Sequence, residues 1–256
     1  MIKVDNLKVS FSGFVAVDSI SFDVEAGQVV GILGSNGAGK STTMKALAGI
    51  IRPESGSITV DGHLLTSLDE EEAARGVIGY CPDVGGLITG NTPREHIQLL
   101  LSLHDRIKDY DIGLYLVHEI GLDKFLDTPV GGFSHGMSRR LSVILATLAS
   151  QKVLILDEPF DGVDPIGVDA IEKIIQEAKA NGLAVIVCTH LQSILTRVVD
   201  DLLIMKNGQI VDRLPAESLR GLEGEKRYKE ILEKSGATDA PETSTSHVDV
   251  SLAEEK

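Results

Sequence analysis

The chain has 256 residues, of which 43% are hydrophobic and 24% charged, and these proportions exclude a collagen-like or wholly disordered protein. Its 38 acidic and 24 basic residues give a formal net charge of −14 at pH 7. Because so acidic a surface repels a phosphate backbone, we expect no nucleic acid among the partners. The two cysteines, Cys81 and Cys188, exclude a disulfide scaffold and a cysteine-rich zinc site.

Short apolar runs separated by glycine turns predict strands over residues 2–4, 20–24, 28–33 and 57–60. A helix is predicted over 42–51, after a glycine-rich loop. Further helices are predicted over 94–103, where Thr92 and Pro93 provide a cap and a first-turn proline, and over 112–120 and 138–149.

The second half of the chain predicts a parallel sheet. Residues 153–156 and 183–188 are almost entirely apolar, as in fully buried strands, and 168–180 between them predicts a crossover helix. This order with short loops is typical of a parallel α/β sheet. Asn207 and Gly208, between the apolar runs 202–205 and 209–212, predict a hairpin. The small, polar and acidic residues 236–256 predict a disordered tail.

A phosphate-binding loop is predicted after the strand at 28–33. The loop reads Gly34, Ser35, Asn36, Gly37, Ala38, Gly39, Lys40, Ser41 and Thr42. It matches G-x-x-x-x-G-K-[ST] in the strand–loop–helix context that this pattern requires, which a plain glycine turn with a surface lysine would not explain. Its N–H groups can converge on an anion, Lys40 adds a point charge, and the Ser41 hydroxyl can ligate Mg²⁺.

Two carboxylates, Asp157 and Glu158, end the strand predicted at 153–156. Beside a nucleotide loop, Asp157 suits a direct or water-mediated contact with Mg²⁺. Glu158, one position further on, is placed to polarise an attacking water as a general base. A solvated strand end is the simpler alternative, but it does not account for the neighbouring phosphate loop.

Further motifs occur in a characteristic order. They are Phe11; Gly79-Tyr80-Cys81-Pro82-Asp83; Phe133-Ser134-His135-Gly136-Met137 before Arg139-Arg140; Phe160-Asp161-Gly162-Val163-Asp164-Pro165; and His190 after an apolar strand. With the phosphate loop and the acidic strand end, they resemble the ATP-binding subunit of an ABC transporter. The resemblance implies a P-loop NTPase core with a mainly parallel sheet, an N-terminal antiparallel β subdomain and an inserted helical subdomain at about 84–150, together covering 1–235.

The resemblance also assigns roles to individual residues. ATP would contact the phosphate loop (34–42), Phe11, Ser134, Gly136 and Asp164, and Mg²⁺ would contact Ser41, Asp83 and Asp157. Glu158 and His190 would be catalytic. Structural alternatives remain: Ser134 as an ordinary helix cap, His190 as a structural histidine, Phe11 as a core aromatic with Phe14 as its competitor, and Asp164 as a turn residue.

Two residues depart from the family pattern. Asp83 stands where the family usually has glutamine, and an ionised aspartate only accepts hydrogen bonds and is shorter. His135 precedes Gly136 where two glycines are usual, and it would either slow this site, make it pH-dependent or point to solvent, the alternative we favour.

The resemblance implies a homodimer or heterodimer of such subunits, because Ser134 would act on the partner's nucleotide. No apolar run reaches the ~18 residues of a membrane span, and residues 1–10 lack the core of a signal peptide. We therefore expect a soluble, cytoplasmic subunit held at the inner face of the membrane by a separate permease, in a system for export. The alternatives are a non-transport ABC ATPase and a catalytically impaired partner in a heterodimer.

Overall fold

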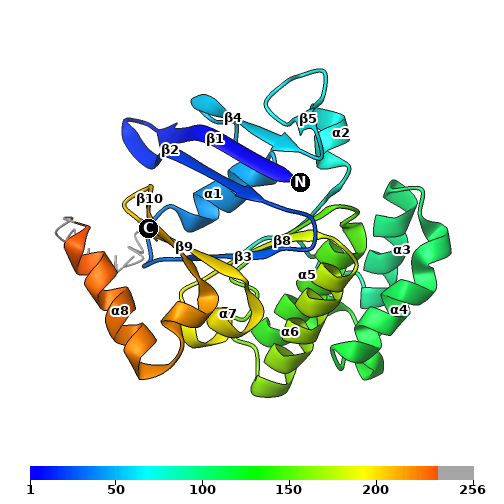
Figure 1. Ribbon diagram of the computed structural model, residues 1–256. Helices are drawn as coiled ribbons and strands as arrows, with labels where there is room; N and C mark the ends of the chain where they lie inside the picture. The colour runs from blue at the N-terminus through cyan, green and yellow to red at the C-terminus, as the bar shows by residue number, and fades with distance from the viewer. Residues whose placement is uncertain (236–256) are drawn as a thin grey trace, which may run out of the picture.

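The computed structural model describes residues 1–235, which form two β-sheets surrounded by helices (Figure 1). The smaller sheet is antiparallel with the order β2-β1-β4-β5, and the larger has the order β10-β9-β3-β8-β7-β6. All pairs in the larger sheet are parallel except β9 with β10. The strands are β1 (Ile2–Phe11), β2 (Phe14–Val24), β3 (Val29–Leu33), β4 (Ser55–Val60), β5 (His63–Leu64), β6 (Ile78–Cys81), β7 (Val153–Asp157), β8 (Ala184–Thr189), β9 (Asp201–Lys206) and β10 (Gln209–Pro215).

The α/β fold with an antiparallel N-terminal sheet confirms the predicted fold class. The α-helices are α1 (Lys40–Leu47), α2 (Glu71–Arg75), α3 (Pro93–Leu103), α4 (Tyr110–Glu119), α5 (His135–Ala149), α6 (Pro165–Ala180), α7 (Gln192–Val198) and α8 (Gly221–Lys234). Short 3₁₀ turns cover Ile107–Asp109, Asp123–Phe125, Val130–Gly132 and Ala216–Leu219. The tail predicted at 236–256 lies outside the described residues.

The parallel strands are apolar on both faces because each face packs on its own hydrophobic cluster. In β3, Val29 and Leu33 belong to the cluster that includes α5 and α6, whereas Val30 and Ile32 belong to the cluster beneath the antiparallel sheet. Successive side chains of a strand point to opposite faces, so a continuous apolar run satisfies both clusters. This packing fixes the carboxyl ends of β3, β7 and β8 at one edge, where ligands of open α/β sheets bind.

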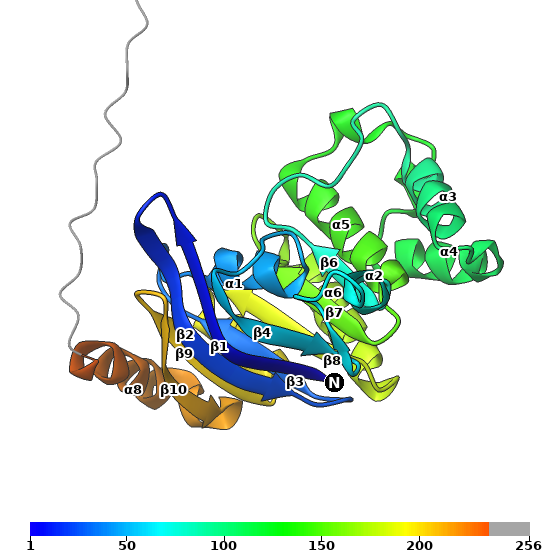
Figure 2. The same ribbon diagram turned by 90° about the horizontal axis from the view of Figure 1, so that it is seen from above.

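The segment between β6 and β7 carries α3, α4 and α5. Figures 1 and 2 show α3 and α4 side by side, beyond α5 and away from α8. Ile97 of α3 and Val117 of α4 share one hydrophobic cluster with Leu141 of α5. The assignment of 84–150 as a separate helical subdomain stays a prediction, and this shared cluster joins its helices to the sheet.

Several predicted boundaries are wrong for identifiable reasons. The helix predicted at 42–51 is α1, which ends at Leu47 because Gly49 takes a left-handed φ of 70°. The helices predicted from 138 and 168 begin earlier, at His135 and Pro165, because the preceding residues cap them. Helices α2, α7 and α8 were not predicted.

Candidate nucleotide site

The glycine-rich loop joins the buried end of β3 to α1 around the side chain of Lys40. Gly37 and Gly39 have φ values of 80° and 100°, and a side chain at Gly34 or Gly39 would collide with a neighbouring backbone carbonyl. Lys40 is 5% exposed, and its Nζ donates to Gly34 O at 2.9 Å and Ser35 O at 3.3 Å. The lysine charge is thereby held against the loop that surrounds it.

Asp157 is the last residue of β7 and is fully buried. Its Oδ1 accepts hydrogen bonds from Ser41 Oγ at 3.1 Å and from the Cys188 thiol at 2.7 Å, and its Oδ2 accepts one from the Tyr80 hydroxyl at 3.5 Å. Burial raises the pKa of Asp157, and the hydrogen bonds from Cys188 and Ser41 oppose that rise. A cation bound nearby would stabilise the ionised form of such a buried carboxylate.

The donor set fits Mg²⁺ that is shared with a phosphate. Within residues 1–235, no group of three or more His, Cys, Asp or Glu is placed to hold a metal ion. Mg²⁺ is usually bound by one or two carboxylates together with substrate phosphates and water, so an all-protein cage is not required. Ser41 and Asp157, held 3.1 Å apart, supply the hydroxyl and carboxylate oxygens of such a site.

Glu158 follows on a strained backbone at the mouth of the site. Its φ is 48°, and its N–H donates to Cys188 O at 2.9 Å, which locks the turn to β8. Its Oε1 lies 3.8 Å from Lys40 Nζ, and its Oε2 lies 3.2 Å from Nδ1 of His190. The predicted pair of Glu158 and His190 is therefore brought together beside the lysine.

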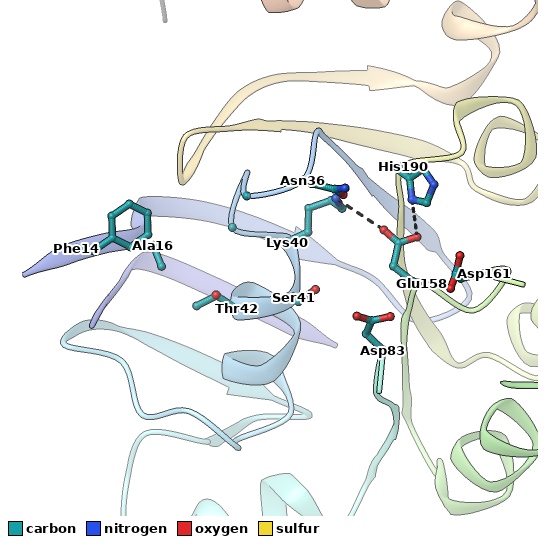
Figure 3. Close-up of a pocket in the computed structure, with 12 residues that line it drawn as sticks. Phe14, Ala16, Asn36, Lys40, Ser41, Thr42, Asp83, Glu158, Asp161 and His190 are labelled. Atoms are coloured by element: carbon teal, nitrogen blue, oxygen red, sulfur yellow. Dashed lines mark hydrogen bonds and ion pairs between the residues drawn. The ribbon is translucent and has the colours of Figure 1, made fainter. Parts of the chain in front are cut away.

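One cavity of about 450 Å³ is lined by Lys40, Ser41, Glu158 and His190, whereas the buried Asp157 does not line it. Figure 3 shows Lys40, Glu158 and His190 converging on it from three different segments, with Asp83 below them. The lining residues are Phe14, Ala16, Asn36, Gly37, Gly39, Lys40, Ser41, Thr42, Asp83, Glu158, Asp161 and His190. Most of the predicted phosphate-loop residues are among them, whereas Phe11, Ser134, Gly136 and Asp164 are not.

Two aromatic residues flank the hairpin turn between β1 and β2. Phe11 pairs with Phe14 across the turn formed by Ser12 and Gly13, and both rings are exposed, Phe11 at 45% and Phe14 at 66%. Neither is therefore a core aromatic. Phe14 lines the cavity and Phe11 does not, so the geometry favours Phe14, the alternative to Phe11, as the aromatic residue of the site.

The Ser134 loop packs against the 160–164 loop of the same chain. Ser134 is the N-cap of α5, its Oγ accepting the Met137 N–H at 3.2 Å. A side chain at Gly136 would collide with Gly162 O, and His135 Nε2 lies 3.0 Å from Asp161 Oδ2. His135 is exposed, as expected, but it is also bonded to a residue that lines the cavity.

Asp164 and Asp83 both lie next to arginines of α5. Asp164 is the N-cap of α6, its Oδ1 accepting the Gly167 N–H at 2.9 Å, and Arg140 Nη2 lies 3.8 Å from its Oδ2. Asp83 lines the cavity, and its Oδ1 lies 3.3 Å from Arg139 Nη2. Both carboxylates are thus tied to the helix that begins after Ser134.

Tyr80, Cys188 and Asp161 contact the site, although the sequence motifs assigned them no role in it. Tyr80 and Cys188 donate to Asp157, and Asp161 lines the cavity. Tyr80 and Cys188 lie near the ends of β6 and β8, and Asp161 lies three positions after Glu158. These positions were available as a signal, because side chains at the carboxyl ends of neighbouring parallel strands lie close together.

The strand, phosphate loop and acidic strand end define an α/β nucleotide-binding protein of the P-loop class. A family model described as ABC transporter matches residues 17–161. The ABC-type transporter ATP-binding protein EcsA of Bacillus subtilis is 31% identical over 222 residues, which is 86% of this chain and 89% of that protein. The bacitracin transport ATP-binding protein BcrA of Bacillus licheniformis is 31% identical over 237 residues, 91% of this chain and 74% of that protein.

A solved structure of an ATP-binding subunit of an ABC transporter has a TM-score of 0.83 and 28% identity, and the match covers 91% of this chain and 99% of that one. The chain belongs to the ABC transporter family, as an ATP-binding subunit that hydrolyses ATP to energise transport. In the part of the chain that the structure describes, no helix combines the length and apolar character needed to cross a membrane.

Proposed function

We propose that this subunit powers export through a separate membrane permease, with ATP bound in the cavity at the ends of β3, β7 and β8. The convergence of Lys40, Glu158 and His190 is the observation that carries the proposal. Export is supported by a similar protein that acts in export, the lipopolysaccharide export system ATP-binding protein LptB of Haemophilus influenzae, which is 32% identical over 193 residues. Measured turnover of Mg-ATP by the purified chain tests the site, and turnover with the permease tests the coupling.

Each residue at the site has a distinct role in the proposed hydrolysis of ATP. Lys40 places its charge where the outer phosphates of ATP would lie, and Ser41 with Asp157 would hold Mg²⁺. When bound, that ion would neutralise charge on the phosphate oxygens. Glu158 accepts the proton of the attacking water, and His190 donates Nδ1–H to the opposite carboxylate oxygen and so orients it.

A dimer is proposed because the Ser134 loop does not line the cavity of its own chain. Ser134 caps α5 and Gly136 lies in its first turn, and neither lines the site, so both are available to close the cavity of a second subunit. In such a pair Lys40 and Ser134 of one active site come from different chains. A mixture of two inactive variants would then contain some dimers with one intact site.

Complementation tests this arrangement. Lys40→Met removes the phosphate charge, and Ser134→Asp keeps a good helix cap but sets a negative charge against phosphate. We expect little turnover from either variant alone and recovered turnover when the two are mixed. No recovery in a mixture of folded variants would contradict the shared site.

The permease is proposed to bind an apolar groove on the helical insert. The groove has a volume of about 240 Å³ and includes Ile88, Leu99 and Leu103, of which Leu103 is 75% exposed. Exposed apolar groups gathered in a groove indicate a binding surface. Leu103→Glu should abolish co-purification with the permease, whereas Leu222→Glu on α8, where the leucine is 77% exposed, should not. Equal co-purification of both would contradict this assignment.

Two alternative functions make different predictions. An impaired partner would need a defective site, yet Glu158 is in place and bonded to His190. A non-transport ATPase would hydrolyse ATP without a response to any permease. Steady-state turnover with and without the membrane partner separates the three functions.

A further inference from the structure

Arg139 is a buried cation on α5, the helix that Ser134 caps. Its side chain is 4% exposed, and its hydrogen-bond acceptors all lie outside that helix. A guanidinium is charged at all relevant pH values and needs acceptors when it is buried. The identity of its acceptors therefore indicates what the residue holds in place.

Arg139 joins two segments of the nucleotide site. Its Nη1 donates to Pro82 O at 2.6 Å and lies 3.5 Å from Asp157 O. Its Nη2 donates to Asp83 O and lies 3.3 Å from Asp83 Oδ1. One side chain thus connects α5, the loop after β6 and the end of β7.

Asp83 lies between this cation and the cavity. Its side chain is 43% exposed and lines the nucleotide cavity, where Figure 3 shows it below Glu158 and beside Ser41. The loop backbone on its other side is held by Arg139. A polyphosphate and its cation in the cavity would meet the Asp83 carboxylate directly, and any displacement of that carboxylate would change its contact with Arg139.

We propose that Arg139 is a positioning residue that holds Asp83 at the edge of the cavity and makes the start of α5, next to Ser134, respond to what the cavity contains. The proposal rests on the proposed function, because it takes the cavity as the ATP site. Backbone bonds to Pro82 and Asp83 make the link stiff, and the ion pair makes it sensitive to charge. A nucleotide is thereby sensed by the loop that the dimer would place on the partner's phosphate.

A merely structural arginine would affect stability alone. Arg106 provides a matched control, because its Nη1 donates to Leu148 O and so anchors the opposite end of α5 away from the cavity. Arg106→Gln should lower the Tm and leave the kcat of the folded protein unchanged. Arg139→Gln should lower kcat about 10- to 100-fold in folded protein, as expected when reacting groups are misplaced by about 1 Å.

The direct readout is hydrogen exchange at residues 135–141, measured with and without Mg-ADP. In the natural protein the nucleotide should slow this exchange, and in Arg139→Gln and Asp83→Asn the response should be lost although nucleotide still binds. Arg139→Lys should restore part of it, since the charge remains but the forked geometry does not. The double variant should be no worse than Arg139→Gln, because both changes break one link.

Normal kcat and a normal exchange response in folded Arg139→Gln would overturn the proposal. If Arg139→Gln does not fold, Asp83→Asn provides the test, since it leaves the hydrogen bonds from Arg139 to the backbone in place. An unchanged exchange response in Asp83→Asn would then overturn the proposal. Failure of the natural protein to bind or hydrolyse Mg-ATP would instead overturn the proposed function, and this inference with it.

Discussion

Ser41 Oγ lies 3.1 Å from Asp157 Oδ1, although 116 positions separate the two residues in the sequence. The contact joins the first turn of α1 to the end of β7. It exists because β3 and β7 lie on either side of β8 in the larger sheet and deliver their carboxyl ends to the same edge. The hydroxyl and carboxylate of the proposed Mg²⁺ site are thus brought together by the order of the strands.

Asp157→Asn should weaken Mg²⁺-dependent nucleotide binding without lowering the stability of the protein. Affinity for nucleotide in the presence of Mg²⁺ should fall about 10- to 100-fold, whereas affinity in EDTA should hardly change. The Tm of the nucleotide-free protein should not fall, because burial raises the pKa of Asp157 and its ionised form therefore costs stability. Titration with a fluorescent ATP analogue and thermal denaturation measure the two effects. Equal losses with and without Mg²⁺ would show that Asp157 is not a metal ligand.

Phe14 should matter for adenine binding more than Phe11. Stacking of a base on an aromatic ring contributes about 1–3 kcal/mol, so Phe14→Ala should raise the Kd for ATP at least about fivefold. Phe11→Ala is the matched control on the opposite side of the same hairpin and should leave the Kd nearly unchanged, because Phe11 does not line the cavity. The reverse pattern would restore Phe11 as the adenine-binding aromatic.

Asp164 should stabilise the fold in a pH-dependent manner. The Gly167 N–H lowers the pKa of Asp164 below its usual 3.8, with a smaller contribution from Arg140. Folding thus favours the ionised form, so this stabilisation is complete above the unfolded pKa and is lost as pH falls through the lower folded pKa.

Asp164→Ala should therefore lower the free energy of unfolding by about 1 kcal/mol at pH 7, the usual contribution of a helix cap. Asp164→Asn, which keeps the acceptor oxygen, should lose less. Urea unfolding at pH 7 and near pH 3 measures the difference between the variant and the natural protein. A difference that grows toward low pH would contradict this role.

Features encoded by local pattern were predictable from the sequence, and features created by tertiary contact were not. The phosphate loop, Asp157 at the end of β7 and His190 directly after β8 follow from motifs with a fixed local geometry. The choice between Phe11 and Phe14 does not, because the two residues face each other across a tight turn and only the packing of the hairpin decides which ring meets the cavity.

Helix α8 illustrates the same limit. Charged residues dominate its sequence, so its composition does not predict a helix that packs on the core. In the structure, Gly224 is the one residue of this helix that is buried. Its contact with the core comes from Tyr228, Ile231 and Leu232, whose i, i+3, i+4 spacing was the available signal. The Arg139–Asp83 contact left no such signal, because no periodicity links the start of a helix to a loop more than fifty positions earlier.

The turnover and assembly of Glu158→Gln test the central claim most directly. The substitution keeps the size of the side chain but removes the charge that accepts the proton of water. We predict that ATP turnover falls about 10²- to 10⁴-fold with ATP affinity nearly unchanged, and that the variant elutes as a dimer in Mg-ATP and as a monomer without it. Turnover close to that of the natural protein would contradict Glu158 as the general base, and a monomer under all conditions would contradict the shared site.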